Sequence, residues 1–597
     1  MSFSQSLPGT QNTDLVTFTI KANNQIIGNR YQISSISIFK EVNRVPVATL
    51  AIYDGDASAQ DFLISNEDTF VPGTEIEINA GYHSDETLLF KGIILRHSIK
   101  IRNDRSPVLL LECRDKAVKM TAARKNKYYY DKKDSEIAEE IIGTYQLENE
   151  VEETTVKHKA IVQYDCTDWD FIMSRMEANG KLCLIDNGKF TIKKPDFSAD
   201  TKLDTVFGAT IIEFDADLDA RYQYKSLKAK TWDYANQQVS SADAEEPGFE
   251  ENGNLSSTDL GDVLNIEEYD LLSGEDITED ELQKLADSRL QKARMTRCRG
   301  RVRFRGYGDI KPGDIINIGG VGERFTGKVF VSGLHHDITG GAWKTDVQFG
   351  LSNDLFTKQP DVHSAPAGNM IPAMQGLQIG VVTDLESDPD SQHRIRVRLP
   401  IIDPQEDGVW SRIASLDAGD NRGMFFRPEV GDEVIVGFLN NDPRNPVVLG
   451  MLNSSAKPAP LTASNQNDEK GYISRSNMKM IFNDADKSLK IETPAGKKVT
   501  ISESDNIIKI EDENGNKIAM DQSSVSIESA GTMSLKSAGD MTIEAANITL
   551  TPSSSFSVSA GGAAIKAGSG SASVTAPSVT VEGSGTATIK GGVVMIN

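Results

Sequence analysis

The sequence predicts a mainly β protein with some α, ending in a needle of β-strands from three intertwined chains. Three observations lead to this fold class. Apolar residues spaced two apart recur through the last hundred residues. Turn signals rich in Gly, Pro and Asn separate β-rich runs through most of the remaining chain. A few stretches between them carry the apolar spacing of helices instead.

The C-terminal repeat is the most regular feature of the sequence. Its apolar pairs return about every eight residues, with Ser, Ala, Gly and Thr between them. Two-apart spacing puts both members of a pair on one face of a strand. The pairs predicted to form a shared core are Val525 and Ile527, Met533 and Leu535, Met541 and Ile543, Ile548 and Leu550, and Phe556 and Val558.

Three architectures could accommodate this repeat. A single-chain solenoid uses about twenty residues per coil. A flat sheet leaves long exposed edges, which favour aggregation. Several identical chains wound together would direct every apolar stripe to one axis. Short strands with small side chains favour this third option, and we expect three chains. A disordered tail would not keep the pairs in phase.

Composition limits the classes of partner and the compartment. The chain has 597 residues, about four domains' worth, and a formal net charge of −24. So acidic a protein argues against nucleic acid as a partner. Four scattered cysteines indicate a reduced protein without a zinc cluster or disulfide framework. The first residues lack signal-peptide features, and no apolar run is long enough to span a membrane.

The N-terminal part is predicted to be strands interrupted by helices. Strands are expected from about 15 to 101, followed by helices over 116–124, 134–145 and 168–178. In the second helix Asp134 is the expected N-cap, with apolar residues on one face. Shorter strands are expected at 182–186 and 190–193.

The stretch 243–280 is the most acidic of the chain and is predicted to be a solvated insertion. It lacks the residue spacing of a calcium loop. Thr278 and Glu281 form a capping box that predicts the start of a helix. Strands are expected again at 314–318 and 328–331, after an Arg-rich alternating segment.

Several motifs of this half resemble those of VgrG-type spike proteins of contractile injection systems. They are Leu111-Glu112-Cys113-Arg114-Asp115, Gln163-Tyr164 leading into Trp169-Asp170-Phe171-Ile172, Arg175 to Gly180, Lys311-Pro312-Gly313-Asp314, and the strand through Gln348. The resemblance implies a phage-hub-like ring. In such a ring each chain contributes two barrel-like β-domains, and three chains form a pseudo-sixfold face.

Residues 380–450 contain the most specific match. The alternating strand Arg394–Leu399, the run Trp410–Ile413, the run Pro428–Val436 and the segment Asp442–Gly450 are enough for a small β-barrel. Their order resembles the OB-fold collar of VgrG and contractile-tail spikes. OB-folds often bind oligonucleotides or sugars. Because the chain is acidic and its exposed aromatic platform is weak, we interpret this barrel as structural.

The resemblance extends to the C-terminal strands, which are similar to the triple-stranded β-helix of the same spikes. The complete prediction is therefore a hub of β-barrel-like domains with helices, an OB-fold collar and an intertwined β-helical needle. The predicted boundaries are 1–359 for the hub ring, 360–376 for a linker, 377–455 for the collar, 456–475 for a second linker and 476–597 for the shaft.

The search for catalytic motifs gives negative predictions. The segment Gly322–Val329 has Val329 where a phosphate-binding loop needs Ser or Thr, so it is interpreted as a hairpin loop. His335 and His336 would point to opposite strand faces and could not share a metal. No serine-hydrolase elbow or zinc-protease helix is present, and the linkers leave no room for an enzyme. We expect no enzyme activity, catalytic residue, cofactor or metal.

The predicted function is the structural central spike of a contractile injection apparatus, either type VI secretion-like, an extracellular phage-tail-like particle or a phage. The spike would connect the inner tube and baseplate to a membrane-piercing tip. The alternative is a trimeric fibre with cell-wall hydrolase or surface-binding activity. We expect synthesis in the cytoplasm without a signal peptide, incorporation into an injection particle, and release or firing to the extracellular space.

The resemblance also implies the partners. They are two further copies of the chain, an inner tube protein ring, baseplate and hub proteins, and possible effector cargo, with a target membrane only on firing. A PAAR-type tip protein would sit on a platform at the C-terminus, formed by Val593, Val594, Met595 and Ile596.

Overall fold

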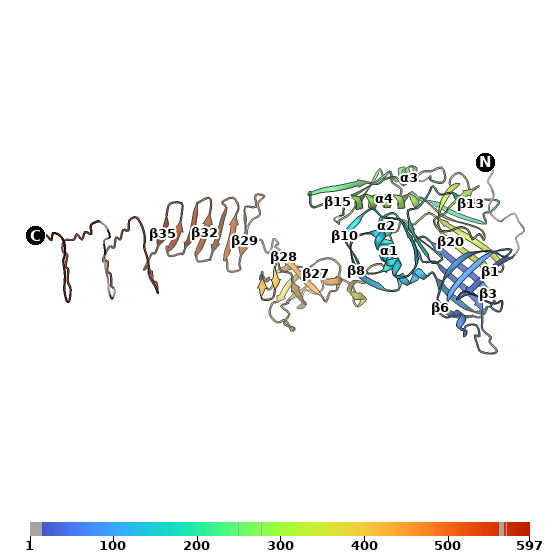
Figure 1. Ribbon diagram of the computed structural model, residues 1–597, viewed down its shortest axis with the longest axis horizontal. Coiled ribbons are helices and arrows are strands. Elements are labelled where there is room, and N and C mark those ends of the chain that lie inside the picture. Colours follow the sequence, from blue (N-terminus) through green and yellow to red (C-terminus); the bar gives the residue numbers. More distant parts are fainter. Residues whose placement is uncertain are drawn as a thin grey trace. The chain divides into compact units, whose positions relative to one another are not determined.

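The computed structural model of the protein describes residues 15–248, 250–275, 277–559, 561, 566, 568 and 570–596 (Figure 1). The chain divides into two compact units, with the boundary between Leu452 and Asn453. Each unit is described separately below.

The first unit is built on a thirteen-stranded, mostly antiparallel sheet. Its main path has the order β14-β18-β21-β20-β3-β4-β7-β6-β5-β1-β2, and β19 joins β20 to β13. The bounds are β1 Val16–Ala22, β2 Gln25–Ile26, β3 Ile33–Glu41, β4 Val47–Tyr53, β5 Glu75–Tyr82, β6 Asp85–Arg102, β7 Arg105–Arg114, β13 Thr201–Val206, β14 Glu213–Leu218, β18 Cys298–Arg305, β19 Ile315–Gly319, β20 Gly327–Thr339 and β21 Ala342–Phe349.

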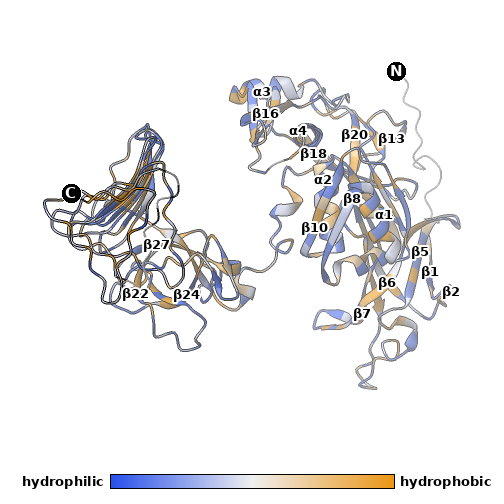
Figure 2. Ribbon diagram, turned by 60° about the vertical axis from the view of Figure 1, so that its left-hand side comes forward, coloured by the Kyte–Doolittle hydropathy of each residue, from blue (hydrophilic) through white to orange (hydrophobic). Residues whose placement is uncertain are grey.

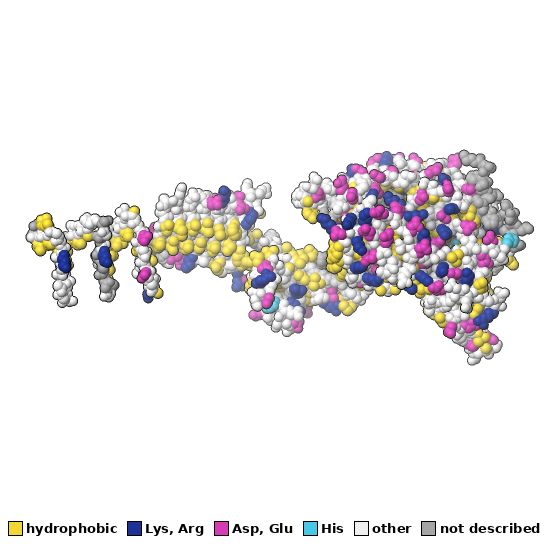
Figure 3. Space-filling model, in the orientation of Figure 1, with side chains coloured by type: hydrophobic (Ala, Val, Ile, Leu, Met, Phe, Trp, Pro, Cys, Tyr) yellow, Lys and Arg dark blue, Asp and Glu magenta, His cyan; other side chains and the backbone are white. Residues whose placement is uncertain are grey.

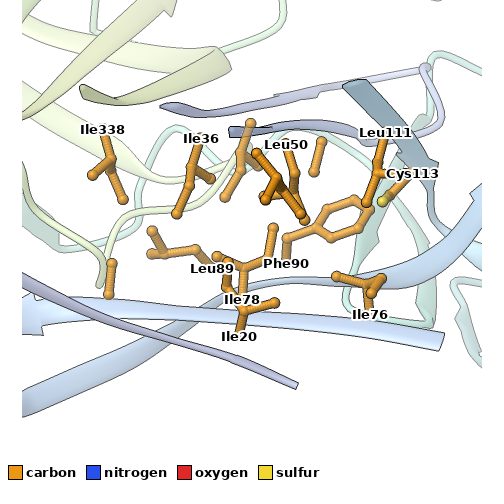
Figure 4. Close-up of a cluster of buried hydrophobic side chains, with 14 of the residues drawn as sticks. Ile20, Ile36, Leu50, Ile76, Ile78, Leu89, Phe90, Leu111, Cys113 and Ile338 are labelled. Atoms are coloured by element: carbon orange, nitrogen blue, oxygen red, sulfur yellow. The ribbon is translucent and has the colours of Figure 1, made fainter. Parts of the chain in front are cut away.

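Alternating side chains of this sheet enclose two apolar cores. Buried and half-buried positions alternate along much of strand β5, and Figure 2 colours the ribbon of this sheet by hydropathy. The first core gathers Ile36, Leu50, Ile78 and Phe90 from four strands, together with Ile338 from β20 (Figure 4). The second core forms around Val302, Phe304, Ile316, Val331 and Val347. The sheet thus passes from one barrel-like core to the next through β20, as predicted for a hub of barrel-like domains.

Helices α1 (Asp134–Thr144) and α2 (Asp168–Ala178) pack with short strands into a third core. These strands are β8 Arg124–Lys133 paired with β10 Lys157–Thr167, and β9 Glu148–Val151, β11 Leu182–Asp186 and β12 Lys189–Lys193 in a second small sheet. The predicted helix α2 is confirmed with its bounds. The helix expected over 116–124 is wrong: a 3₁₀-helix, η2 (Lys116–Thr121), is followed by strand β8.

Asp134 is the first residue of α1 and not its N-cap, which is Lys133. The Asp134 carboxylate bonds to Arg175, His158 and Asn179, so it is unavailable for capping the helix. Tertiary partners therefore replace the local role that the sequence predicted.

The acidic stretch 243–280 is more ordered than predicted. It contains α3 (Ser257–Leu264) and β17 (Glu268–Leu272), which pairs with β15 (Ser226–Asp233) beside β16 (Gln238–Asp243). Leu260 and Leu271 contribute apolar contacts, which explains why this charged stretch folds. The predicted capping box is confirmed, because Thr278 and Glu281 cap helix α4 (Glu279–Met295) reciprocally.

The last part of the first unit is a closed five-stranded barrel. Its strands are β22 Gln378–Asp384, β23 Ile395–Arg398, β24 Val409–Ile413, β27 Glu433–Phe438 and β28 Pro446–Met451, closing in the order β22-β23-β24-β28-β27. Valines from β22, β23, β27 and β28 fill its core. A Cβ on Gly380 would lie 2.4 Å from Cγ1 of Val397, so the tight core requires glycine there.

Short elements complete this unit. A two-stranded ribbon, β25 Ala418–Gly419 with β26 Arg422–Gly423, lies in a barrel loop, and the remaining 3₁₀-helices are η1 Asp68–Phe70, η3 Phe356–Lys358, η4 Pro366–Asn369 and η5 Leu439–Asn441.

The second unit contains one seven-stranded antiparallel meander, in which each strand pairs with the next (Figure 1). Its strands are β29 Glu469–Ile473, β30 Lys479–Asn483, β31 Ser488–Glu492, β32 Lys498–Ser502, β33 Ile507–Glu511, β34 Lys517–Met520 and β35 Val525–Glu528. In the described part of the chain after Glu528 no strand is formed. None of the helices in the described residues is long and apolar enough to cross a membrane.

Candidate functional site

The C-terminal meander presents one continuous apolar face, which we call the apolar ladder. Its two rows follow from the strand register. One row runs through Tyr472, Met480, Ile491, Val499, Ile510, Ile518 and Ile527, and the other through Phe482, Leu489, Ile501, Ile508, Met520 and Val525. A band of hydrophobic side chains covers this sheet in Figure 3.

Within one chain the apolar ladder is not covered by a second layer. Ile501 is 45% exposed and Ile510 is 49% exposed, although both lie in central strands of the sheet. The ladder borders a groove of about 680 Å³ lined by Ile491, Val499, Ile510, Ile518 and Met533. Soluble proteins rarely leave so continuous an apolar surface open to water, so it marks an interaction site.

The opposite face of the sheet is largely polar, although it includes Ile481, Ile507 and Ala519. Thr500 lies at the middle of β32, and Lys490 and Lys509 occupy the same row on neighbouring strands. Each strand therefore separates an apolar face from a hydrated one, as two-residue periodicity dictates. An assembly that buries the apolar ladder would leave this polar face outside.

The structure brings together only part of the predicted core set. Val525 and Ile527 lie on β35, opposite Met520 and Ile518, and extend the apolar ladder. The remaining predicted core residues lie in described segments that form no strand, and all of them are exposed: Met533, Leu535, Met541, Ile543, Ile548, Leu550, Phe556 and Val558. Their common burial stays a prediction.

The predicted platform residues Val593, Val594, Met595 and Ile596 are also exposed in the single chain. They belong to no strand of the chain, and their role stays a prediction. The last residue of the sequence, Asn597, lies outside the described residues.

Sequence reasoning missed a Ser-His-Asp arrangement on the large sheet. Ser37 Oγ lies 2.9 Å from His335 Nε2, and His335 Nδ1 lies 3.4 Å from Asp346 Oδ2. Burial lowers the pKa of His335, although Asp346 opposes this shift. His335 and Asp346 lie on the consecutive strands β20 and β21, whereas Ser37 lies on β3, 298 residues from His335 in sequence. Because only the folded sheet brings Ser37 to His335, no local motif could have revealed the arrangement.

Further contacts hold the three residues within the sheet. The ring of Phe39 stacks on the imidazole at 3.9 Å between centroids. Arg303 holds Asp346 through two hydrogen bonds of 2.8 and 3.1 Å and joins it to Glu213. The backbone of β20 is engaged in ladders with both β3 and β21. The residues form part of a polar ladder across the sheet.

The other candidate motifs are positioned as the sequence predicted. The loop that includes Gly322 connects antiparallel strands β19 and β20 as a hairpin, with the Thr326 hydroxyl donating to the Gly322 carbonyl. His335 and His336 have different partners, since His336 bonds to Thr345. No cluster of three or more potential metal ligands occurs among the residues that the structure describes.

The basic side chains of the small barrel are largely neutralised. Arg394 bonds to Asp388 and Asp390, and Arg396 lies 2.9 Å from Asp407. Arg396 also lies over the ring of Trp410. Phe425 is an exposed aromatic that the sequence analysis did not weigh, and Arg427 lies 5.0 Å from its ring. The alternating basic strand therefore does not form an open cationic groove.

Comparison with known families agrees with this architecture. The profile of the Alg8 N-terminal domain matches residues 12–340. The profile of the type VI secretion system/phage-baseplate injector OB domain matches residues 378–452, which include the closed barrel.

Individual proteins match over shorter stretches. Type VI secretion system spike protein VgrG1b of Pseudomonas aeruginosa is 24% identical over 218 residues, which cover 34% of this chain and 29% of that protein. Actin cross-linking toxin VgrG1 of Vibrio cholerae is 26% identical over 134 residues, 21% of this chain and 12% of that protein. The chain thus spans less than a third of the length of these relatives. The solved tail protein from Neisseria meningitidis MC58 has a TM-score of 0.43 and 12% identity, covering 58% of this chain and 99% of that one.

The match to the injector OB domain and the VgrG matches support a VgrG-type spike protein. Because its matched region includes more than half of the sequence, the chain belongs to the family of the Alg8 N-terminal domain.

Proposed function

We propose that the protein is the structural central spike of a contractile injection apparatus. The observation that carries this proposal is the apolar ladder, which runs along a single-layered sheet and has no cover within its own chain. A spike must resist bending and shear when it is driven forward. Three chains that bury their ladders together would form a stiff prism.

Burial of the ladders supplies the driving force for assembly. Ile501 and Ile510 are already about half buried, so covering the rest of each side chain would stabilise by roughly 1 kcal/mol. The described residues between Glu528 and Ala560 form no strand within the chain, so their backbone groups are open to pairing with strands of another copy. Strands from two further copies would provide both the apolar cover and the hydrogen bonds. This supports an intertwined triple-stranded β-helix.

The same proposal assigns a role to each of the other parts of the chain. Residues 1–359 would form the hub ring that contacts the inner tube and baseplate proteins, and residues 377–455 the collar. Residues 360–376 and 456–475 would be linkers, and 476–597 the shaft. Val593, Val594, Met595 and Ile596 would form the platform for a PAAR-type tip protein. The shaft would meet a target membrane only on firing, and effector cargo is a possible further partner.

We propose a purely structural role, without enzymatic activity or a cofactor. In the Ser37-His335-Asp346 arrangement, Phe39 stacks on the imidazole and Arg303 engages the carboxylate, which supports a structural role. The match to the actin cross-linking toxin covers only 12% of that protein, so most of it has no counterpart here. A cell-wall hydrolase on a trimeric fibre is the alternative, and a zymogram on purified peptidoglycan separates the two functions. Clearing by the intact chain would contradict the structural proposal.

The function is tested with two adjacent substitutions on β32 in the producing cell. Ile501→Asp places a carboxylate on the apolar ladder, whereas Thr500→Asp places one on the polar face. We expect Ile501→Asp to remove the spike from purified injection particles, as seen by electron microscopy and immunoblotting. Thr500→Asp should leave it in place. Equal retention of both variants would refute the role of the ladder in the assembled spike.

A further inference from the structure

The polar face of the C-terminal sheet carries a row of alternating charges, which we call the ion row. It lies at one end of the strands and consists of Lys479, Glu492, Lys498, Glu511, Lys517 and Glu528. Every neighbour across the strands has the opposite charge. Two of these contacts are ion pairs, between Lys498 and Glu492 at 3.8 Å and between Lys517 and Glu528 at 3.0 Å.

The middle of the same face has a different charge pattern. Lys490 on β31 pairs in register with Thr500, and Thr500 in turn pairs with Lys509 on β33. The Lys509 ammonium turns toward Glu511 on its own strand. Lys509, and less strongly Lys498 and Lys517, hold the pKa of Glu511 below its ordinary value. The two rows together contain five lysines on five successive strands.

The apolar ladder alone does not fix the register of these strands. A one-residue slip would turn every apolar side chain to the polar face, so it is strongly disfavoured. A two-residue slip keeps the faces unchanged. In the pair β31–β32, for example, such a slip would still place Leu489 opposite Val499, with one apolar pair lost. Another interaction is therefore needed to select the register of these short, similar strands.

The ion row supplies that signal. In the observed register Lys479 faces Glu492, Glu492 faces Lys498, and Lys498 faces Glu511. A two-residue slip in one direction would bring lysines together in four successive strand pairs. The resulting neighbours would be Lys479 with Lys490, Lys490 with Lys498, Lys498 with Lys509, and Lys509 with Lys517. Like charges directly opposite each other destabilise a sheet.

We propose that the ion row selects the strand register of the C-terminal sheet, by attraction in the observed pairing and by lysine–lysine repulsion in the slipped one. The row thereby keeps the two rows of the apolar ladder continuous. The slip in the opposite direction loses the contact of Glu492 with Lys498 without adding this repulsion. The inference depends on the sheet of a single chain and not on the proposed function.

Pairs of cysteines introduced into the full-length protein report the register. Ser488 lies opposite Ser502 in the observed pairing, so the combination Ser488→Cys with Ser502→Cys should form an intrachain disulfide only there. Ser488→Cys with Thr500→Cys should form one only after the two-residue slip. Disulfide-linked peptides from chains of monomer mass on non-reducing gels are quantified by mass spectrometry.

Three charge variants are compared in both reporter backgrounds. Lys498→Glu removes two attractive neighbours and turns the slipped Lys490 contact into an attractive one. We expect the ratio of slipped to observed disulfide to rise about tenfold, given typical cross-strand pair energies. Lys497→Glu is the matched control, because Lys497 lies in the adjacent turn and pairs with Glu513. Its ratio should not change.

Lys490→Glu keeps the proposal testable if Lys498→Glu does not fold. Lys490 is exposed and faces Ile481 and Thr500, so its reversal leaves the ion row intact. This variant removes only the repulsion in the slipped state, and its ratio should rise a few-fold. The proposal is wrong if Lys490→Glu and every folded Lys498→Glu sample give the same ratio of slipped to observed disulfide as Lys497→Glu. The turns and apolar residues alone would then set the register.

Discussion

At the scale of single residues, the buried Asp134 carboxylate organises the contact between α1 and α2. Burial alone would raise its pKa, but hydrogen bonds from His158, Arg175 and Asn179 together hold the pKa well below its ordinary value. Two of these bonds come from the Arg175 guanidinium, at 2.8 and 3.0 Å. The charge is therefore stable only while these partners remain in place.

We predict that Arg175→Leu costs roughly 3–5 kcal/mol of unfolding free energy, because it leaves a buried carboxylate without its countercharge. Asp134→Asn removes the charge as well and should cost less. Chemical denaturation of the full-length variants, followed by tryptophan fluorescence, measures both. If Arg175→Leu were as stable as the unmodified chain, the Asp134 network would have no role in holding α1 against α2.

The buried His336 should make the stability of the protein depend on pH. Burial, with smaller contributions from Lys40 and His335, lowers its pKa to about 3. At pH values between the ordinary pKa of histidine and this lowered pKa, His336 is protonated in the unfolded chain but not in the folded chain. Stability should therefore fall as pH drops below about 6.5, and the loss should be complete near pH 3.

At 1.36 kcal/mol per pKa unit, the shift limits the loss of unfolding free energy to about 5 kcal/mol per chain. His336→Gln should flatten the pH dependence, since glutamine can still bond to Thr345 without titrating. His363→Gln, at an exposed position, is the control. Thermal unfolding between pH 7 and pH 4 measures the slopes. Identical slopes for His336→Gln and His363→Gln would exclude His336 as the source.

At the scale of elements, we expect that the small barrel does not bind nucleic acid. The Arg394 and Arg396 side chains are paired with carboxylates, and the whole chain has a net charge of −24. Because phosphate binding requires accessible positive charge, the protein should not bind single-stranded DNA at physiological ionic strength. Fluorescence anisotropy with a labelled oligonucleotide tests this. Saturable binding that weakens with salt would contradict it.

Sequence patterns predicted the elements whose signals are local. The bounds of α2 and the Thr278–Glu281 cap of α4 are confirmed, because capping and apolar spacing lie within a few residues. The same rules failed at β8, which pairs with the distant β10, and in 243–280, where β17 pairs with β15. Long-range pairing decides such segments, and one sequence does not reveal it.

The C-terminal sheet shows the same division between local and distant information. The apolar pair Val525 and Ile527 predicted strand β35, since a strand needs only two-residue alternation. The pairs from Met533 to Val558 predicted further strands, which the single chain does not form. An isolated short strand has no hydrogen-bonding partner, so the proposed intertwining would complete it. The charges of the ion row are present in the sequence, but only the strand register shows which of them lie opposite each other.

The distal repeat gives a matched pair of substitutions. Ile543→Asp would bring three carboxylates together at the axis of a three-chain needle, costing at least several kcal/mol beyond the lost burial. Thr542→Asp should cost far less, because alternation directs this side chain outward. Detergent- and heat-resistant oligomer is measured for both variants on gels. Equal tolerance would mean that the distal stripes do not form a core.

At the scale of the whole molecule, the prediction is a trimer. One copy does not cover the apolar ladder, because its sheet is a single layer and no strand forms in the described residues beyond β35. Three copies would give each ladder two neighbours around a common axis and satisfy the backbone of the distal segments. Native mass spectrometry of the full-length protein should therefore show three chains that persist in mild denaturant. Ile501→Asp should shift the population towards single chains, while Thr500→Asp should leave it trimeric. A stable monomer of the unmodified chain would overturn the shared core, and the spike that depends on it.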